Sequence, residues 1–397
     1  MKIAVNVRWL LPNKLEGTGI YTLRMLEQIL PAAKEHEFLL MWDRPSAMKG
    51  MRDQFSFLNA PNITHKLVIP PARHPWLWWY WNSIGVPAAL KSWGAARYWS
   101  PDGLPARTKI KQWLTIHDLN FEHHPEWVPP HVGRYYRTHI RRGARMAEQL
   151  FTVSEWSAKD LVETYGVAAG KIVVTPNAPQ RPMSPGKSRF EEHYFCAVGA
   201  LTPRKNLITL LKAWDRWLEK HPERRGFHLN IAGNAHFKDP IFESAMGEMK
   251  HLDTVNWLGR LEDDALEQLY RGAIAFCMPS AMEGFGIPVV EAMQCGTPVM
   301  ASNNSALTEV VGDAGMLLPT FDVEAWAEGL EAMASGSEKK AGASETMAGE
   351  SEAMAGGSGM TGEGGEHWSV KGLIRGGQFT WSASAAPWLE VLTSTIK

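Results

Sequence analysis

The sequence predicts an α/β protein built from two doubly wound domains with parallel sheets. Two observations carry this prediction. Short apolar runs alternate with helical patterns through residues 194–333, and a less regular version of the same alternation occupies the first half of the chain. Such alternation is typical of βαβ units, whose parallel sheet is covered by helices on both faces. The length of 397 residues fits two or three domains at the usual ~100–200 residues each.

The first half of the chain is expected to form a domain over residues 1–180. Continuous or alternating apolar runs indicate strands, and apolar residues three and four apart indicate helices. The expected strands cover residues 3–7, 38–42, 66–69, 112–116, 150–153 and 172–175, and the expected helices cover residues 20–30, 131–147 and 157–164. Prolines and a glycine then interrupt every periodic pattern, which predicts a linker over residues 181–193.

The second domain is expected over residues 194–375. Its expected strands cover residues 194–198, 227–231, 273–278, 298–301 and 316–318. Apolar residues after the first of these strands follow the period of an amphipathic helix: Leu207, Leu210, Leu211, Trp214 and Leu218. This pattern is the one expected of helices that cover a parallel sheet.

The composition changes over residues 334–366 to Gly, Ser, Ala, Glu and Met, which predicts a low-complexity insertion. A partner-binding loop and a local duplication in a tolerant surface loop both fit this composition, and the duplication is favoured because such segments are flexible. An apolar, Trp-containing helical pattern resumes over residues 379–392, so residues 376–397 are expected to end the chain with a helix.

The charge balance argues against a nucleic-acid binder. The chain has 41 Lys and Arg against 42 Asp and Glu, whereas nucleic-acid affinity depends on many basic groups. No apolar run reaches the ~18–20 residues that cross a bilayer, and the apolar start is too short for a secretory signal. Three cysteines without ligand-like spacing indicate buried, reduced thiols, and the protein is therefore expected to be cytoplasmic.

A glycine-rich turn lies between two glutamates in the second domain. The turn follows the strand expected to end near residue 278, and Pro288 stands where the first turn of a helix tolerates it. The free N–H groups and the dipole of a helix start favour an anion, above all a phosphate. Glu283 and Glu291 flank the turn, and their carboxylates suit sugar or ribose hydroxyls better than phosphate. The alternative is a solvated helix with two surface glutamates.

Two adjacent cations, Arg204 and Lys205, follow the first strand of the second domain, with Asn206 as a candidate helix N-cap. This position lies at the carboxyl end of the sheet, where ligands bind in open α/β folds. A charged hydrogen bond to a diphosphate is worth ~1.5–3 kcal/mol. A solvated surface pair is the alternative, and the position after a strand favours the binding site.

Two further motifs stand in the first domain. Gly17 and Gly19 follow its first strand, and glycines let a backbone approach a ligand closely, although a simple turn explains the pair equally well. His117 and Asp118 follow the strand over 112–116. The imidazole of His117 could donate a hydrogen bond to a substrate oxygen while Asp118 braces the loop, or the histidine could be purely structural.

Together these motifs resemble the retaining glycosyltransferases of family 4, which have the GT-B fold. The resemblance covers residues 1–332 and returns weakly over 372–392. Its most specific element is the pair of glutamates eight residues apart, Glu283 and Glu291, and residues 199–207, 115–119 and 151–157 are also similar to the family. The resemblance implies two Rossmann-like domains that face each other across a cleft.

The resemblance also implies the residues of the donor site. Arg204 and Lys205 should hold the donor diphosphate, and Glu291 should bind the ribose. Glu283 should act on the donor sugar and its phosphate together with the backbone of Gly284, Phe285 and Gly286. The base contacts of the family come mostly from backbone near residues 259–261, so base identity stays open.

The first domain should complete the site. Gly17 and Gly19 should approach the donor diphosphate from the other side, and His117 should contact the donor sugar near the reacting carbon. The expected reaction moves a hexose from a nucleotide sugar to a saccharide or lipid-linked saccharide, as in polysaccharide or lipopolysaccharide assembly, with mannosyl transfer as one case. After residue 333 the sequence departs from the pattern of the family. This departure puts the packing of the last helices in doubt, including the helix that should return to the first domain.

No cofactor and no metal are expected. Two protein cations stand where a metal would stabilise the leaving phosphate, and no Asp-x-Asp pair occurs in a suitable loop. The resemblance favours retention by front-face attack over a covalent intermediate, and no carboxylate in the sequence stands out as a nucleophile. A sugar-nucleotide epimerase or hydrolase and a non-catalytic sugar-nucleotide-binding subunit are the alternatives. Product analysis with and without acceptor separates the enzymes, and the intact motifs speak against the subunit.

A run of aromatic residues over 75–81 contains four tryptophans and precedes a helix with Arg134, Arg137, Arg141 and Arg145. The aromatic run could bind sugar rings, or it could settle among lipid headgroups at the inner face of a membrane, to which the basic stripe would be attracted. The favoured interpretation is plainer: the tryptophans belong to the core and the arginines to a solvated face.

Overall fold

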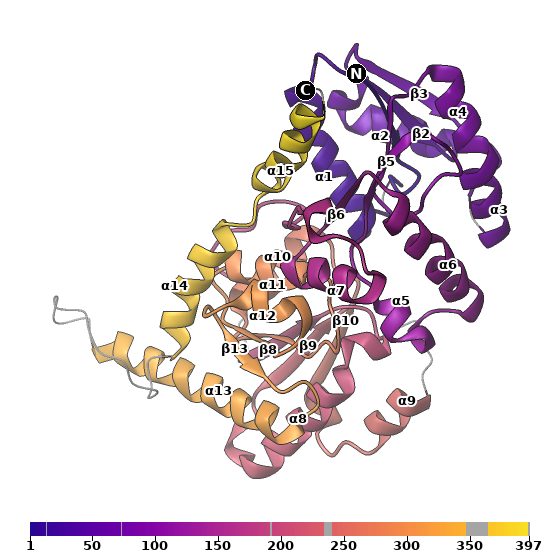
Figure 1. Ribbon diagram of the computed structural model, residues 1–397. Coiled ribbons are helices and arrows are strands. Elements are labelled where there is room, and N and C mark those ends of the chain that lie inside the picture. The colour runs from indigo at the N-terminus through magenta and orange to yellow at the C-terminus, as the bar shows by residue number, and fades with distance from the viewer. Residues whose placement is uncertain (13, 73, 191–192, 234–239, 347–363, 396–397) are drawn as a thin grey trace. The chain divides into compact units, whose positions relative to one another are not determined.

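The computed structural model describes the chain except residues 13, 73, 191–192, 234–239, 347–363 and 396–397, and the chain forms two compact units (Figure 1). Unit 1 comprises Met1–Gln180 and Phe379–Lys397, and unit 2 comprises Arg181–Gln378. Each unit has its own parallel sheet and its own hydrophobic core.

The described residues of unit 1 form a seven-stranded sheet in the order β3-β2-β1-β4-β5-β6-β7. The strands are β1 (Lys2–Asn6), β2 (Glu37–Trp42), β3 (Ile63–Leu67), β4 (Arg97–Ser100), β5 (Lys111–Thr115), β6 (Gln149–Thr152) and β7 (Ile172–Val174). Neighbouring strands pair in parallel, so their carboxyl ends share one edge. The strand order reverses between β1 and β4, and such a reversal point is where ligands bind in open parallel sheets.

Helices cover both faces of this sheet. They are α1 (Gly17–Ala32), α2 (Pro45–Gln54), α3 (Pro75–Tyr80), α4 (Val86–Trp93), α5 (Asn120–His123), α6 (Pro130–Met146), α7 (Glu155–Tyr165) and α15 (Trp381–Ser394), with short turns at Ser56–Asn59, Trp81–Gly85, Pro125–Trp127 and Ala169–Lys171. The apolar stripe of α1, which includes Tyr21, Leu26 and Ile29, is fully buried against the sheet.

The last helix, α15, packs within unit 1 although it comes more than 200 residues after the rest of that unit. Trp388 is fully buried, and its ring centroid lies 5.1 Å from that of Trp99 and 5.3 Å from that of Trp113. The indole N–H of Trp381 donates to the carbonyl of Pro179 at 2.7 Å. These contacts give the C-terminal segment a fixed place in the core of unit 1.

The described residues of unit 2 form a six-stranded parallel sheet in the order β10-β9-β8-β11-β12-β13. The strands are β8 (Tyr194–Val198), β9 (His228–Ala232), β10 (Val255–Gly259), β11 (Phe276–Met278), β12 (Val299–Ser302) and β13 (Met316–Leu318). The order reverses between β8 and β11, and in open parallel sheets ligands bind at the carboxyl ends of the strands beside such a reversal.

The helices of unit 2 surround its sheet. They are α8 (Leu207–Lys220), α9 (Pro240–Gly247), α10 (Asp263–Gly272), α11 (Ile287–Gln294), α12 (Ser305–Val311), α13 (Val323–Thr346) and α14 (Gly364–Gly377), with short turns at Pro203–Lys205, Pro222–Arg224 and Leu252–Thr254. The periodic residues of α8 are buried with Trp326 and Leu330 of α13, so these two helices share one face of the core.

The structure differs from the sequence-based expectations in several places. Strands β4 and β10 were not expected, and β3 lies three residues before its expected start. The expected loop over 334–366 is helical up to Thr346 and again from Gly364, because Ala, Glu and Met are strong helix formers; residues 347–363 lie outside the described part.

The expected linker belongs to unit 2. Arg181 pairs with Asp264 and Glu267, both at 2.9 Å, and the backbone N–H of Met183 donates to Gln294 at 3.1 Å. No helix in the described part of the chain is long and apolar enough to cross a membrane.

Candidate functional site

The loop after β8 presents two cations at the reversal point of unit 2. Pro203–Lys205 form one turn of 3-10 helix, and Asn206 takes a positive φ of 49° before α8 begins. The amide of Asn206 donates to the carbonyls of Pro279 and Thr320, each at 2.9 Å, and makes no N-cap bond. The expected cap therefore ties three loops together instead, and it fixes the backbone next to Arg204 and Lys205.

Glu283, which follows β11, pairs with both cations. Its Oε2 accepts from the guanidinium of Arg204, and its Oε1 accepts from Lys205 Nζ at 2.8 Å. Burial alone would raise the pKa of Glu283, but the charges of Lys205 and Arg204 outweigh burial and lower this pKa to about 2. The carboxylate is ionised at neutral pH, and the cluster of Arg204, Lys205 and Glu283 keeps one positive charge in excess.

This cluster can bind an anion. The side chain of Glu283 is 9% exposed, whereas that of Arg204 is 27% exposed, so the guanidinium is the part that a ligand can reach. The backbone holds the cluster rigidly, because Ala281 N–H donates to the Arg204 carbonyl at 2.8 Å and Glu283 N–H donates to Ser305 Oγ at 3.0 Å. Donors fixed in this way stabilise a developing negative charge without reorganising.

The start of α11 lies directly after this cluster. Gly286 has a φ of 105°, and a Cβ there would stand 2.7 Å from Leu307 Cδ2, so only glycine fits this position. Gly284 and Phe285 are buried, and Pro288 lies in the first turn of the helix. The helix start thus adds backbone N–H groups and its dipole beside Glu283.

Glu291 is held by other partners. It is 8% exposed, and its Oε2 accepts from the hydroxyl of Tyr270 at 3.0 Å. Burial raises the pKa of Glu291 to about 7, despite the lowering effect of the Tyr270 hydrogen bond. The expected ribose-binding carboxylate is therefore a group that titrates near neutrality.

His117 lies at the carboxyl edge of the sheet of unit 1. Its Nε2 donates to the carbonyl of Pro101 at 2.9 Å, and its ring meets the ring of Tyr21 edge-on at 5.0 Å. Burial lowers the pKa of His117, so the neutral form is favoured. Because the carbonyl takes the only N–H of the neutral ring, Nδ1 is left as an acceptor. In this neutral form His117 can accept a further hydrogen bond at Nδ1, and its N–H is already used by the Pro101 carbonyl.

The two glycines of the first domain differ in their surroundings. A Cβ on Gly17 would meet nothing within 4 Å, so this position is open. A Cβ on Gly19 would stand 2.6 Å from the carbonyl oxygen of Trp9, so Gly19 is required for the packing of α1 against the loop after β1. Only Gly17 has the open surroundings that approach to a ligand requires.

The structure thus groups the predicted residues within each unit. Unit 2 brings Arg204, Lys205 and Glu283 together at its reversal point, and Gly284, Phe285 and Gly286 connect this cluster to α11. Glu291 lies one helical repeat further along, while Gly17, Gly19 and His117 belong to unit 1. The described residues contain no group of three or more His, Cys, Asp or Glu side chains arranged to hold a metal ion.

A second ion pair, which the sequence did not predict, lies at the reversal point of unit 1. Arg8 follows β1, Asp102 follows β4, and Nε of Arg8 donates to Oδ2 of Asp102 at 2.7 Å. The pair could not be predicted from residue patterns, because β4 was not expected and Asp102 was therefore not recognised as the residue after a strand. The signal that could have found it is the short aromatic run Tyr98-Trp99 before Asp102.

The two parallel-sheet units with these strand orders define a GT-B fold. The family described as Glycosyltransferase Family 4 matches residues 22–178, and the family described as Glycosyl transferases group 1 matches residues 182–347. The chain belongs to these glycosyltransferases, and the two matches meet near the boundary between the units.

Individual proteins agree with this assignment. The chain is 32% identical over 222 residues to O-antigen chain mannosyltransferase B of Escherichia coli, a match that covers 53% of this chain and 58% of that protein. It is 25% identical to O-antigen chain mannosyltransferase RfbU of Salmonella typhimurium, over 70% of this chain and 76% of that protein. The structure of HepE from Anabaena, in complex with UDP and glucose, superposes with a TM-score of 0.69 at 16% identity, over 99% of this chain and 100% of that one.

Proposed function

We propose that this protein transfers a hexose from a nucleoside diphosphate sugar to a hydroxyl of a saccharide acceptor, with retention of configuration. The observation that carries the proposal is the cluster of Arg204, Lys205 and Glu283 at the reversal point of unit 2. Two comparisons support this proposal: the similar proteins include O-antigen mannosyltransferases, and the similar structure of HepE holds UDP and glucose.

The donor binds to unit 2 in this proposal. Its diphosphate takes hydrogen bonds from the more exposed Arg204 and from Lys205, and from backbone N–H groups at the start of α11. Glu283 holds both cations in place before the donor arrives, and it has lone pairs left for a sugar hydroxyl. Glu291 accepts from the ribose hydroxyls.

The chemistry follows from the charges that develop. The bond between the anomeric carbon and the β-phosphate oxygen breaks, and the acceptor oxygen forms the new bond on the same face. The proton of the acceptor hydroxyl passes to the leaving phosphate. Arg204 and Lys205 stabilise the negative charge that grows on this phosphate, so they bind the transition state more tightly than the ground state. The mechanism needs no metal ion and no cofactor.

Unit 1 contributes the other groups. His117 accepts a hydrogen bond at Nδ1 from a hydroxyl of the donor sugar, and Gly17 leaves room for the diphosphate. The acceptor is a saccharide or lipid-linked saccharide in the cytoplasmic assembly of a cell-surface polysaccharide or lipopolysaccharide, and a mannose is the hexose that the relatives favour.

The test is product analysis with a panel of nucleotide sugars, including GDP-mannose and UDP-glucose, with and without saccharide acceptors. Transfer should occur in excess EDTA, and NMR should show the anomeric configuration of the donor in the product. Conversion of the nucleotide sugar without any acceptor would instead identify an epimerase or hydrolase. Binding without turnover would identify a non-catalytic subunit.

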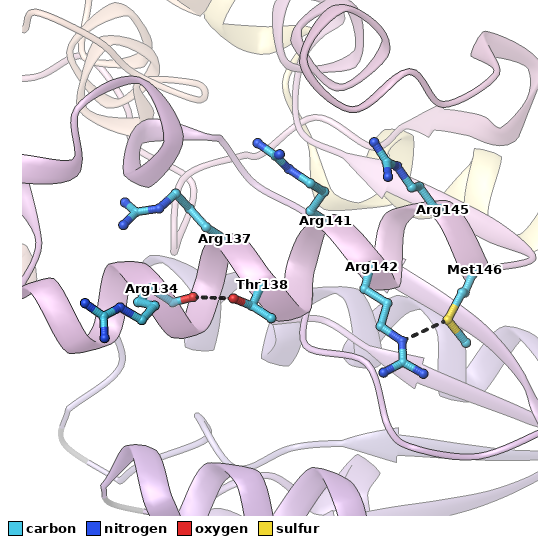
Figure 2. A pocket seen from close by; sticks show the side chains of 7 residues that line it. All are labelled: Arg134, Arg137, Thr138, Arg141, Arg142, Arg145 and Met146. Atoms are coloured by element: carbon cyan, nitrogen blue, oxygen red, sulfur yellow. Dashed lines mark hydrogen bonds between the residues drawn. The ribbon is translucent and has the colours of Figure 1, made fainter.

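We also propose that unit 1 contacts an anionic membrane surface through α6 and α3. A groove of about 620 Å³ on α6 is lined by five arginines, with Arg137, Arg141 and Arg145 along one side and Arg142 with Met146 on another (Figure 2). Glu122 forms an ion pair with Arg141 at 3.1 Å and so neutralises one of these charges. In the aromatic run over 75–81, one tryptophan is buried in the core and two are exposed at the surface. Trp81 is fully buried, but Trp76 and Trp79 are 80% and 45% exposed, as at a lipid interface.

Vesicle sedimentation tests this contact. The protein should sediment with vesicles that contain phosphatidylglycerol and should stay in solution with phosphatidylcholine alone, because each basic group near an anionic surface adds ~1 kcal/mol. Arg134→Glu with Arg142→Glu should abolish sedimentation, while Arg225→Glu on unit 2 serves as the control. Equal sedimentation with both lipids, or none with either, contradicts the proposal.

A further inference from the structure

The reversal point of unit 1 carries a buried ion pair that none of the predicted roles uses. The side chains of Arg8 and Asp102 are 3% and 6% exposed, and they belong to loops that are 94 residues apart in sequence. Burying two charges costs several kcal/mol each unless hydrogen bonds satisfy them, so a pair of this kind requires further partners.

Asp102 has these partners. Its carboxylate accepts from Ser100 Oγ at 2.7 Å, Trp9 Nε1 at 3.0 Å and Asn6 Nδ2 at 3.2 Å, in addition to Arg8. Burial alone would raise the pKa of Asp102, but the charge of Arg8 and the hydrogen bonds from Ser100 and Trp9 lower it. Asp102 therefore stays ionised, and it anchors the loop after β1 to the loop after β4.

Trp9 is the exposed member of this network. This residue is 36% exposed, yet two contacts fix its ring: the indole N–H donates to Asp102, and the guanidinium of Arg8 lies 5.1 Å from the ring centroid. Its backbone carbonyl abuts Gly19, which fixes the loop that carries the ring. A large apolar ring on a protein surface is ordinarily free to change rotamer. Here it is held in one orientation at the carboxyl edge where ligands bind in such sheets.

We propose that Trp9 is the stacking platform for a sugar ring of the acceptor, and that Arg8 and Asp102 are the positioning residues that orient it. This inference rests on the proposed function, which places a saccharide acceptor on unit 1. The C–H groups on one face of a pyranose pack against an aromatic face, which has negative electrostatic potential. Because the charges of Arg8 and Asp102 cancel, the platform carries no net charge and suits a neutral saccharide.

The chain offers a matched control in Trp93. This tryptophan of α4 is also partly exposed and also has a cation over its ring, since Lys2 Nζ lies 5.2 Å from the ring centroid. Lys2 begins β1, so Trp93 marks the amino edge of the sheet, opposite to Trp9. Trp93 packs against the core of unit 1, and of these two tryptophans only Trp9 lies at the binding edge.

Saturation-transfer NMR without any donor tests the inference, with the methyl glycosides of mannose, glucose, galactose and N-acetylglucosamine as probes. At least one glycoside should bind the wild-type protein, Trp9→Ala should weaken binding about tenfold, and Trp93→Ala should leave it unchanged. Trp9→Phe, which keeps a ring but loses the bond to Asp102, should fall between these results. Thermal stabilisation by GDP or UDP, retained in each variant, shows that unit 2 is intact.

Two results overturn the inference: no glycoside binds the wild-type protein, or Trp9→Ala binds as well as Trp93→Ala. These failures differ from failure of the proposed function. If glycosides bind at Trp9 but no nucleotide sugar is consumed, the transferase proposal is wrong and the platform stands. If transfer occurs and Trp9→Ala leaves glycoside binding unchanged, the acceptor lies elsewhere on the protein.

Discussion

Arg204→Met gives the most informative single variant, because the structure separates its effect on catalysis from its effect on stability. The substitution removes one of the two cations that pair with Glu283, but Lys205 remains bonded to Glu283 at 2.8 Å. The buried carboxylate therefore keeps a partner, and the loss of stability should be about 1 kcal/mol. The loss of a fixed donor to the leaving phosphate should raise the barrier by ~3 kcal/mol, which lowers turnover on the order of 100-fold.

The assay is the initial rate of nucleoside diphosphate release in the presence of acceptor, alongside a thermal unfolding curve. Arg224→Met is the control, because Arg224 forms a comparably buried pair with Glu331 at 3.0 Å in the same unit but away from the reversal point. The control should lose stability and keep its rate. If Arg204→Met retains a third or more of wild-type turnover, or if both variants lose activity equally, the reasoning about the phosphate is wrong.

Three further predictions concern stability and mechanism. The raised pKa of Glu291, about 7, means that this group stabilises the folded state fully below its ordinary pKa of 4.5 and loses that contribution as the pH rises through 7. Glu291→Gln should thus be more stable than wild type by about 3 kcal/mol at pH 8 and equal to it at pH 4 in urea titrations, and equal stability at both pH values would contradict this. Glu283→Gln should lower turnover without any covalent sugar on the protein, and a glycosyl adduct in mass spectrometry would refute front-face attack. Trp388→Ala should destabilise unit 1 by about 3–5 kcal/mol while GDP or UDP still stabilises unit 2, and a small loss would show that α15 is not part of the core.

The sequence predicted the strands that carry continuous apolar runs, because such runs are buried on both faces in a parallel sheet. It missed β10, whose residues after Val255 are only partly buried, and β4, which has four residues and begins with Arg97. Residues 334–346 were expected to form a loop because they contain glycines and serines, but the strong helix formers among them continue α13.

The residues of the cluster at the reversal point of unit 2 could be singled out from the sequence because they stand in the loops that follow β8 and β11. Their mutual contacts could not: Arg204 and Glu283 are 79 residues apart, and only the strand order places β8 beside β11. The same limit hid Arg8 and Asp102, since β1 and β4 become neighbours only when the sheet forms. The orientation of His117 likewise depends on a carbonyl from another loop, which no local pattern reveals.

A crystal structure of the protein with bound GDP or UDP tests the central claim most directly. We expect diphosphate oxygens to lie within hydrogen-bond distance of the Arg204 guanidinium and the Lys205 ammonium group, next to the start of α11. A nucleotide bound with its diphosphate away from both cations would contradict it.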